Sequence, residues 1–284
     1  MVEEIVDPRE TRSLLCEFAP ASRTVKDHRA RQLWNAAMTC FEVWRDGKSI
    51  RKVSFAAFFV FALQGTLASA AGEYEQSLRL AGQSKFAEAF ALLLPLAESG
   101  ERKAQYIVGE SYYWGTGVAQ NREAAVKWYR KAADAGLPEA KFNLAYAYKK
   151  GVGLKADPAR YEPLLIAAAK AGYDKAQQDY SVVLRERKQY KLALQWALRA
   201  ANQGVIAAQV NAGHFYRLGY GTAVNDDEAL FWLGIASPNF AQADQFAKSL
   251  AQKIGPERTD RVIKRMALWT PKPELAPITS SGRK

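Results

Sequence analysis

The chain has 284 residues and a formal net charge of +11 at pH 7. This excess of basic residues favours anionic partners such as membrane surfaces, acidic polysaccharides or nucleic acid. The two cysteines, Cys16 and Cys40, both precede residue 70, so a structural disulfide is excluded from the rest of the chain.

The first 70 residues contain a pattern typical of export. A basic run (Arg45, Lys48, Arg51 and Lys52) precedes an apolar segment over 53–67 and the small-residue sequence Ala68-Ser69-Ala70. These features predict a signal peptide over 45–70 with cleavage near Ala70. The apolar run is shorter than the ~20 residues that a membrane-spanning helix needs. An uncleaved inner-membrane anchor that faces the periplasm is the alternative.

Residues 1–44 carry mixed charge without periodicity or a known motif. A signal peptide begins near the N-terminus of a protein. We therefore interpret residues 1–44 as an extension outside the native protein, with translation starting at Met38 or Val43.

From residue 73 the chain becomes periodic. Residues 73–100, EYEQSLRLAGQSKFAEAFALLLPLAESG, predict a first helical hairpin. Glycines that end helices then follow at Gly100, Gly136, Gly172 and Gly204, at intervals of 36, 36 and 32 residues. A fixed period of this size indicates stacked supersecondary units.

Each unit repeats small residues at two levels of its first helix. They are Ala104, Ala140, Ala176 and Ala208, and five positions later Gly109, Ala145, Ser181 and Gly213. Small residues let a second helix approach closely, while larger side chains fill the remaining space. These larger residues are Tyr112, Tyr148 and Tyr216 on the first helices and Trp128, Leu164, Trp196 and Trp232 on the second.

A short glycine loop separates the two helices of most units. Gly115 and Gly117 are not followed by the lysine and hydroxyl of a phosphate-binding loop, so we interpret them as turn residues. Asn121, Asp157 and Asn225 precede the second helices, where an Asx side chain caps free backbone N–H groups; these three are predicted caps.

These residues carry a family resemblance. The sequence AQYIVGESYYWGTGVAQNREAAVKWYRKAADAG, residues 104–136, resembles a Sel1-like repeat, a helical hairpin related to tetratricopeptide repeats. Similar units occupy 101–136, 137–172, 173–204 and 205–236, and the 173–204 unit lacks the glycine loop. Residues 73–100 resemble a shorter tetratricopeptide-like hairpin.

The resemblance implies an all-α fold, an α/α solenoid of about five helical hairpins with closing C-terminal helices. Residues 237–271 resemble the closing segment of many bacterial Sel1-like proteins. Residues 272–284 are rich in proline, serine and charge without periodicity, and are predicted to be disordered.

Signatures of catalysis are absent from the sequence. It contains no HExxH and no GxSxG, and no cofactor or metal ligand set is predicted. Asp226, Asp227 and Glu228 form the densest carboxylate group, but they fall in the first turn of a helix, where negative charge complements the helix dipole. We therefore do not expect an enzyme.

The resemblance implies a non-catalytic scaffold or adaptor for protein–protein interaction, and the export signal places it in the periplasm of a bacterial envelope. Its expected partner is an envelope protein or peptide, and nucleic acid is not expected. One alternative is a binder of anionic polymer or lipid, since residues 71–284 hold 30 basic and 21 acidic residues. The other is a cell-wall or β-lactam-binding enzyme, a role reported for cysteine-rich relatives, which this chain does not resemble.

The partner is predicted to bind one face of the first helices. Positions three, seven, ten and fourteen after each glycine lie opposite the repeated core positions and vary between units. The predicted contact residues are Trp114, Asn143, Tyr146, Lys150, Asn211 and His214. The alternative is that Trp114 and Tyr146 pack against neighbouring hairpins and belong to the core.

Overall fold

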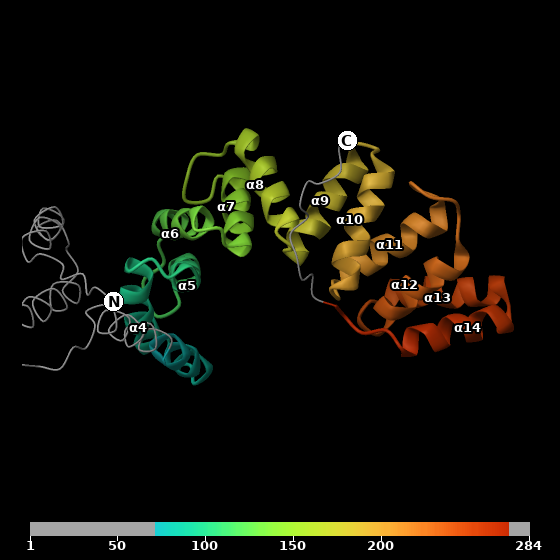
Figure 1. Ribbon diagram of the computed structural model, residues 1–284, viewed down its shortest axis with the longest axis horizontal. Coiled ribbons are helices and arrows are strands. Elements are labelled where there is room, and N and C mark those ends of the chain that lie inside the picture. Colours follow the sequence, from blue (N-terminus) through green and yellow to red (C-terminus); the bar gives the residue numbers. More distant parts are fainter. Residues whose placement is uncertain (1–71, 273–284) are drawn as a thin grey trace, which may run out of the picture. The chain divides into compact units, whose positions relative to one another are not determined.

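The computed structural model describes residues 72–272 (Figure 1). The predicted N-terminal extension, signal peptide and all but the first residue of the predicted tail lie outside the described residues. The chain divides into two compact units after residue 67, and every described residue belongs to the second unit, residues 68–284.

The described residues form helices and no strand. A helix over 72–82 and α4 (Phe86–Glu98) make the first hairpin. The next hairpins are α5 (Arg102–Trp114) with α6 (Arg122–Asp134), α7 (Pro138–Lys150) with α8 (Pro158–Lys170), α9 (Asp174–Glu186) with α10 (Tyr190–Asn202), and α11 (Ile206–Leu218) with α12 (Asp226–Ala236). A 3-10 turn, η1 (Ser237–Asn239), leads to α13 (Ala241–Ile254) and α14 (Pro256–Ala267).

From α4 onward each helix packs against the next one along the chain, and α12 also contacts α14 (Figure 1). The core is accordingly a series of neighbouring apolar clusters, each built by the helices of one or two adjacent hairpins. The prediction of an α/α solenoid with closing helices is therefore confirmed.

The repeated small residues lie where helices approach most closely. Ala104, Ala140, Ala176 and Ala208 are completely buried. A Cβ at Gly109 would come within 2.7 Å of the Tyr129 ring, and one at Gly213 within 2.5 Å of Leu233 Cγ. The second helix thus occupies the space that a larger side chain would take, as the sequence predicts.

The predicted helix caps are confirmed. Asn121 Oδ1 accepts a hydrogen bond from the Ala124 amide at 3.0 Å, and Asp157 Oδ1 accepts one from Ala159 at 3.1 Å. Asn225 Oδ1 accepts one from Glu228 at 3.1 Å. These bonds satisfy backbone donors that a helix N-terminus leaves without partners.

The second loop glycine has a role beyond turning the chain. Gly117 has a φ of 75°, and a Cβ there would collide with the carbonyl oxygen of Phe86 at the start of α4. A Cβ at Gly153 would likewise collide with the backbone of Arg122 at the start of α6. A Cβ at Gly221 would collide with the backbone of Tyr190 and Lys191 at the start of α10. Each glycine loop therefore rests on the second helix of the preceding hairpin.

The unit without a glycine loop makes this contact differently. Between α9 and α10, Lys188 takes a left-handed φ of 59°. The two terminal guanidinium nitrogens of Arg187, Nη1 and Nη2, each donate to an oxygen of the Glu162 carboxylate on α8 at 2.6 Å. A bidentate ion pair thus takes the place of the backbone contact between consecutive hairpins.

The acidic first turn of α12 connects to the closing helices. Its three carboxylates form three ion pairs. Asp226 pairs with Lys253 of α13 at 2.8 Å. Asp227 pairs with Arg258 of α14 at 2.8 Å, and Glu228 pairs with Arg265 of α14 at 2.6 Å. These carboxylates therefore fix α13 and α14 onto α12 in addition to complementing its dipole.

No helix between residues 72 and 272 is both long enough and apolar enough to cross a bilayer.

Candidate partner-binding site

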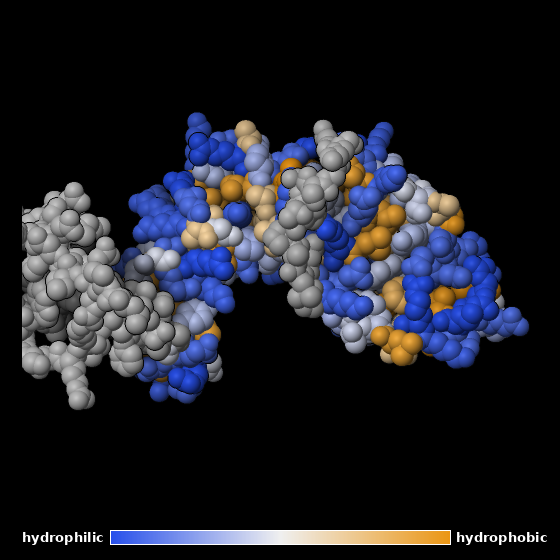
Figure 2. Space-filling model, viewed as in Figure 1, coloured by the Kyte–Doolittle hydropathy of each residue, from blue (hydrophilic) through white to orange (hydrophobic). Residues whose placement is uncertain are grey.

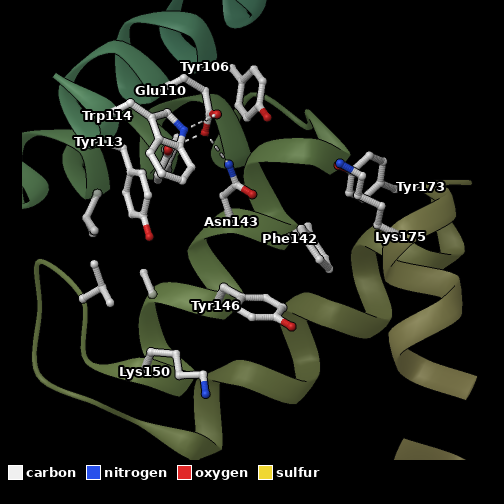
Figure 3. Close-up of a pocket in the computed structure, with 14 residues that line it drawn as sticks. Tyr106, Glu110, Tyr113, Trp114, Phe142, Asn143, Tyr146, Lys150, Tyr173 and Lys175 are labelled. Carbon is white, nitrogen blue, oxygen red and sulfur yellow. Dashed lines mark hydrogen bonds between the residues drawn. The ribbon is translucent and has the colours of Figure 1, made fainter. Parts of the chain in front are cut away.

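Four of the six predicted contact residues line one pocket. Trp114 comes from α5, and Asn143, Tyr146 and Lys150 come from α7 (Figure 3). The pocket has a volume of about 380 Å³ and extends to Tyr173 and Lys175 at the start of α9. It therefore joins the first helices of three successive hairpins.

The repeat period explains why these side chains meet. Because α5 and α7 are equivalent first helices 36 residues apart, Tyr106 corresponds to Phe142, and Trp114 to Lys150. Stacking the hairpins brings these equivalent positions next to one another along the first helices.

Glu110 organises one end of the pocket. Its Oε1 accepts hydrogen bonds from the Tyr129 hydroxyl at 2.5 Å and the Asn143 amide at 2.7 Å. Its Oε2 accepts one from the Trp114 indole at 3.2 Å (Figure 3). One carboxylate thus connects residues of α5, α6 and α7.

Aromatic rings form the walls. The ring centroids of Tyr113 and Trp114 lie 4.8 Å apart, and those of Phe142 and Tyr146 5.1 Å apart. Phe142 also meets Tyr173 edge to face at 5.2 Å. Edge-to-face and tilted pairs of this kind hold the rings in defined positions.

The hydroxyls of Tyr106, Tyr129 and Tyr173 stay neutral in the pocket. Burial and the nearby Glu110 carboxylate raise the pKa of Tyr106 to about 12. Burial, together with the hydrogen bond to Glu110, raises the pKa of Tyr129, and burial also raises that of Tyr173. At neutral pH these groups therefore donate or accept hydrogen bonds without adding charge.

The aromatics at the pocket mouth are accessible. The exposed fraction of Trp114 is 67% and that of Tyr146 is 38%. Trp114 touches Tyr113 of its own helix and Glu110, and the rest of its ring faces solvent. Tyr146 also interacts with Asp179 of α9 on the next hairpin, and contact of these two aromatics with a partner stays a prediction.

The other two predicted residues lie outside this pocket. Asn211 Oδ1 accepts a hydrogen bond from Arg185 of α9 at 3.3 Å. The His214 ring meets Phe246 of α13 edge to face at 5.1 Å, and Arg217 stacks on the same phenyl ring at 4.6 Å. Burial, with Arg217 and Arg185 nearby, lowers the pKa of His214.

Several pocket residues were not among the six predicted contacts. They include Tyr106, Glu110, Tyr113, Tyr129, Phe142, Tyr173 and Lys175. Glu110 and Lys175 occupy variable positions ten and three of their helices, so the repeat alignment could have found them. Tyr129 lies on a second helix, and only the fold shows that its hydroxyl reaches α5.

Two further observations describe the chemistry of the pocket and of the surface around it. Among residues 72–272, no group of three or more His, Cys, Asp or Glu side chains could hold a metal ion. Figure 2 shows a largely hydrophilic face with separate hydrophobic patches over the described helices. An aromatic pocket within a polar surface is typical of a recognition site.

Comparison with known proteins identifies the repeat. The sequence profile of the Sel1 repeat matches residues 102–137, 138–160, 185–205 and 206–237. The crystal structure of a Sel1 repeat protein from Oxalobacter formigenes is similar, with a TM-score of 0.57 and 32% sequence identity. That similarity covers 58% of this chain and 49% of the other.

Two curated proteins share shorter segments. An uncharacterized protein of Neisseria meningitidis serogroup B is 36% identical over 88 residues, which cover 31% of this chain and 18% of that protein. Chitin synthase regulatory factor 3 of Schizosaccharomyces pombe is 36% identical over 61 residues, 22% of this chain and 6% of that protein. The chain thus spans less than a fifth of either curated relative.

Proposed function

We propose that this chain, which matches the Sel1 repeat over four segments, is a scaffold for protein–protein interaction and binds a protein or peptide segment at the pocket between α5 and α7. The observation that carries this proposal is the exposed Trp114 beside Tyr146 at the mouth of an aromatic pocket. Exposed aromatic anchors next to a pocket are typical of interaction hot spots.

The cellular location of this scaffold is proposed from the sequence. The basic, apolar and Ala-Ser-Ala segments over 45–70 favour export to the periplasm, with an inner-membrane anchor as the alternative. The partner is then an envelope protein or peptide. Recovery from the native host of a mature chain that starts near Ala71 supports export, and recovery of a peptide from residues 1–30 contradicts the proposed downstream start.

A photocrosslinking experiment in a bacterial host tests the site. A photoreactive residue placed at Lys150, which is exposed at the pocket, should capture a protein whose identity mass spectrometry then gives. Replacing both Trp114 and Tyr146 by alanine should abolish capture, while the helical circular-dichroism spectrum and the melting temperature stay near those of the wild type.

A matched control uses apolar residues of similar exposure elsewhere. Leu192 and Val224 are 48% and 58% exposed and lie outside the pocket. Their double replacement by alanine should leave capture unchanged. If capture survives the loss of Trp114 and Tyr146, or if that variant unfolds, the pocket is not the binding site.

Binding of an anionic polymer or lipid is the second candidate, since residues 71–284 carry an excess of basic residues. The densest basic cluster, on α14, is largely engaged: Arg258 and Arg265 pair with α12, and Lys264 pairs with Asp260 at 2.7 Å. This pairing favours the protein partner. Strongly salt-dependent binding to anionic vesicles would instead favour the polymer or lipid. We propose no catalytic role.

A further inference from the structure

We infer that the pocket between α5, α7 and α9 recognises an isolated basic side chain of the partner polypeptide, with Glu110 as its counter-charge. The inference rests on the proposed function, because it names the chemistry recognised at the same site. Three features carry it: a carboxylate without a cation, a second carboxylate that acts on the same tyrosines, and aromatic walls.

The charge of Glu110 is not compensated within the described chain. Its three hydrogen-bond donors are a phenol, an amide and an indole, and all of them are neutral. No cationic side chain of residues 72–272 forms an ion pair with it. A carboxylate has about four acceptor sites, so Oε2 can still accept a hydrogen bond from a ligand.

A second carboxylate adds to the negative potential at this end. Glu139, in the first turn of α7, has a buried Oε2 that finds no hydrogen-bond partner in the described structure. Glu110 and Glu139 both help to raise the pKa of Tyr106 and of Tyr173, so both act on the same part of the pocket. Glu139 does not line the pocket itself, so it favours a cationic ligand there through its charge and not through a direct hydrogen bond.

The aromatic walls suit a cation as well. The faces of tyrosine and tryptophan rings carry negative electrostatic potential and attract guanidinium and ammonium groups. The cavity of about 380 Å³ can take one long side chain. Trp114 gains most from such a ligand, because the residue is 67% exposed and its indole bonds to the Glu110 carboxylate.

Lysines of the chain restrict the ligand further. Lys150 lies at the far end of the pocket from Glu110, and Lys175 lies beside Tyr173 (Figure 3). Lys149 stands 5.8 Å from the centroid of the Tyr146 ring. These charges repel a run of basic residues. They favour one basic side chain with neutral or acidic neighbours.

Short peptides added to the full chain test the inference. The probes are acetyl-Ala-Arg-Ala-amide, its lysine analogue, and the citrulline analogue, which keeps the shape of arginine without its charge. The readout is the indole N–H signal of Trp114 in nitrogen-15 NMR spectra, identified by its loss in Trp114→Phe. The arginine or lysine peptide should shift this signal and bind about tenfold more tightly than the citrulline peptide, or more.

Variants locate the counter-charge. Glu110→Gln keeps a hydrogen-bond acceptor for Tyr129 and should weaken binding of the basic peptide about tenfold or more. Glu186→Gln is the matched control, because Glu186 is an exposed carboxylate at the end of α9 and outside the pocket. It should leave affinity unchanged. Lys150→Gln should leave affinity equal or make it higher.

Equal binding of the arginine and citrulline peptides, or no shift of the Trp114 signal with any basic peptide, would overturn the inference. If Glu110→Gln unfolds, Glu110 is a structural link, and the comparison of peptides on the native chain then decides alone. Failure here is separable from failure of the proposed function. Crosslinking that depends on Trp114 and Tyr146 can persist without any preference for a basic side chain.

Discussion

At the scale of single residues, two glycines with similar backbone conformations have different surroundings. Gly117 has a φ of 75° and Gly136 a φ of 90°. A Cβ at Gly117 would collide with the backbone of Phe86, whereas one at Gly136 meets nothing within 4 Å. Gly117 is therefore required both by its left-handed backbone and by the lack of room for a Cβ. Gly136 is required by its left-handed backbone alone.

The first prediction follows from this pair. Gly136→Ala should lower the free energy of unfolding by about 1–2 kcal/mol, the cost of a left-handed alanine. Gly117→Ala should lower it by clearly more, because the α4 backbone must also move. Chemical denaturation of both variants measures the difference, and equal losses would contradict the contact between the glycine loop and α4.

The second prediction concerns His214, whose pKa is lowered from its ordinary value of 6.5 by burial and by Arg217 and Arg185. The unfolded chain therefore takes up a proton before the folded chain does. Stability should fall as the pH drops below about 6.5, until the folded-state pKa is passed. His214→Gln should reduce this fall. Denaturation at several pH values measures it, and identical pH profiles would show that His214 is as free to titrate as in the unfolded chain.

At the scale of helices, the contact between α6 and α7 depends on Ala140, which is completely buried among residues of both. Ala140→Leu, the third prediction, should overpack this contact and lower the free energy of unfolding by about 1–3 kcal/mol. Ala207→Leu is the control, because Ala207 is exposed on α11. Equal melting temperatures for the two variants would show that the α6–α7 contact tolerates a larger side chain.

The sequence predicts the helices well because their signals are local. The small residues, the caps and the glycine turns each depend on neighbours within one hairpin, so a repeated pattern shows them. The role of three glutamines was not predicted from the sequence, although they occupy the same position in three of the repeats. Gln105, Gln177 and Gln209 follow the helix-ending glycine by five positions and bond to the carbonyl of Ala97, Ala169 and Ala201 respectively.

The site was harder to predict from the sequence, because its contacts join residues of different hairpins. The helical period placed Trp114, Asn143, Tyr146 and Lys150 on one face, and the structure brings these four to one pocket. The role of Glu110 depends on partners 19 and 33 residues away, at Tyr129 and Asn143. No local pattern indicates that a side chain of α6 and one of α7 meet the same carboxylate.

At the scale of the described stack, the last hairpin needs a cover. A solenoid buries each unit only against its neighbours, so the terminal unit would expose its outer face. Here α13 and α14 pack on α12 and keep Leu230, Phe231 and Trp232 buried. Arg265 lies 3.7 Å from the centroid of the Phe231 ring, and Trp269 meets Trp232 edge to face at 6.3 Å.

The chain after α14 extends this cover to the preceding hairpin. The Lys272 amide donates a hydrogen bond to the Asn202 carbonyl at the end of α10, at 2.8 Å. Pro271 lies where a Cβ of Gly204 would touch it at 3.3 Å, so the glycine leaves room for the proline ring. The closing segment thus joins α12 to the end of the unit before it.

The fourth prediction tests this closing function with two truncations. Ending the chain at residue 240 removes α13, α14 and their three ion pairs to α12, and should expose the apolar face around Phe231 and Trp232. We expect a lower melting temperature and self-association, because an uncovered apolar face of this kind associates with others. Ending the chain at residue 272 keeps every closing contact of the described residues, and we expect it to change neither property. Thermal denaturation and light scattering measure both. A monomeric 240-residue chain with an unchanged melting temperature would show that α12 needs no cover.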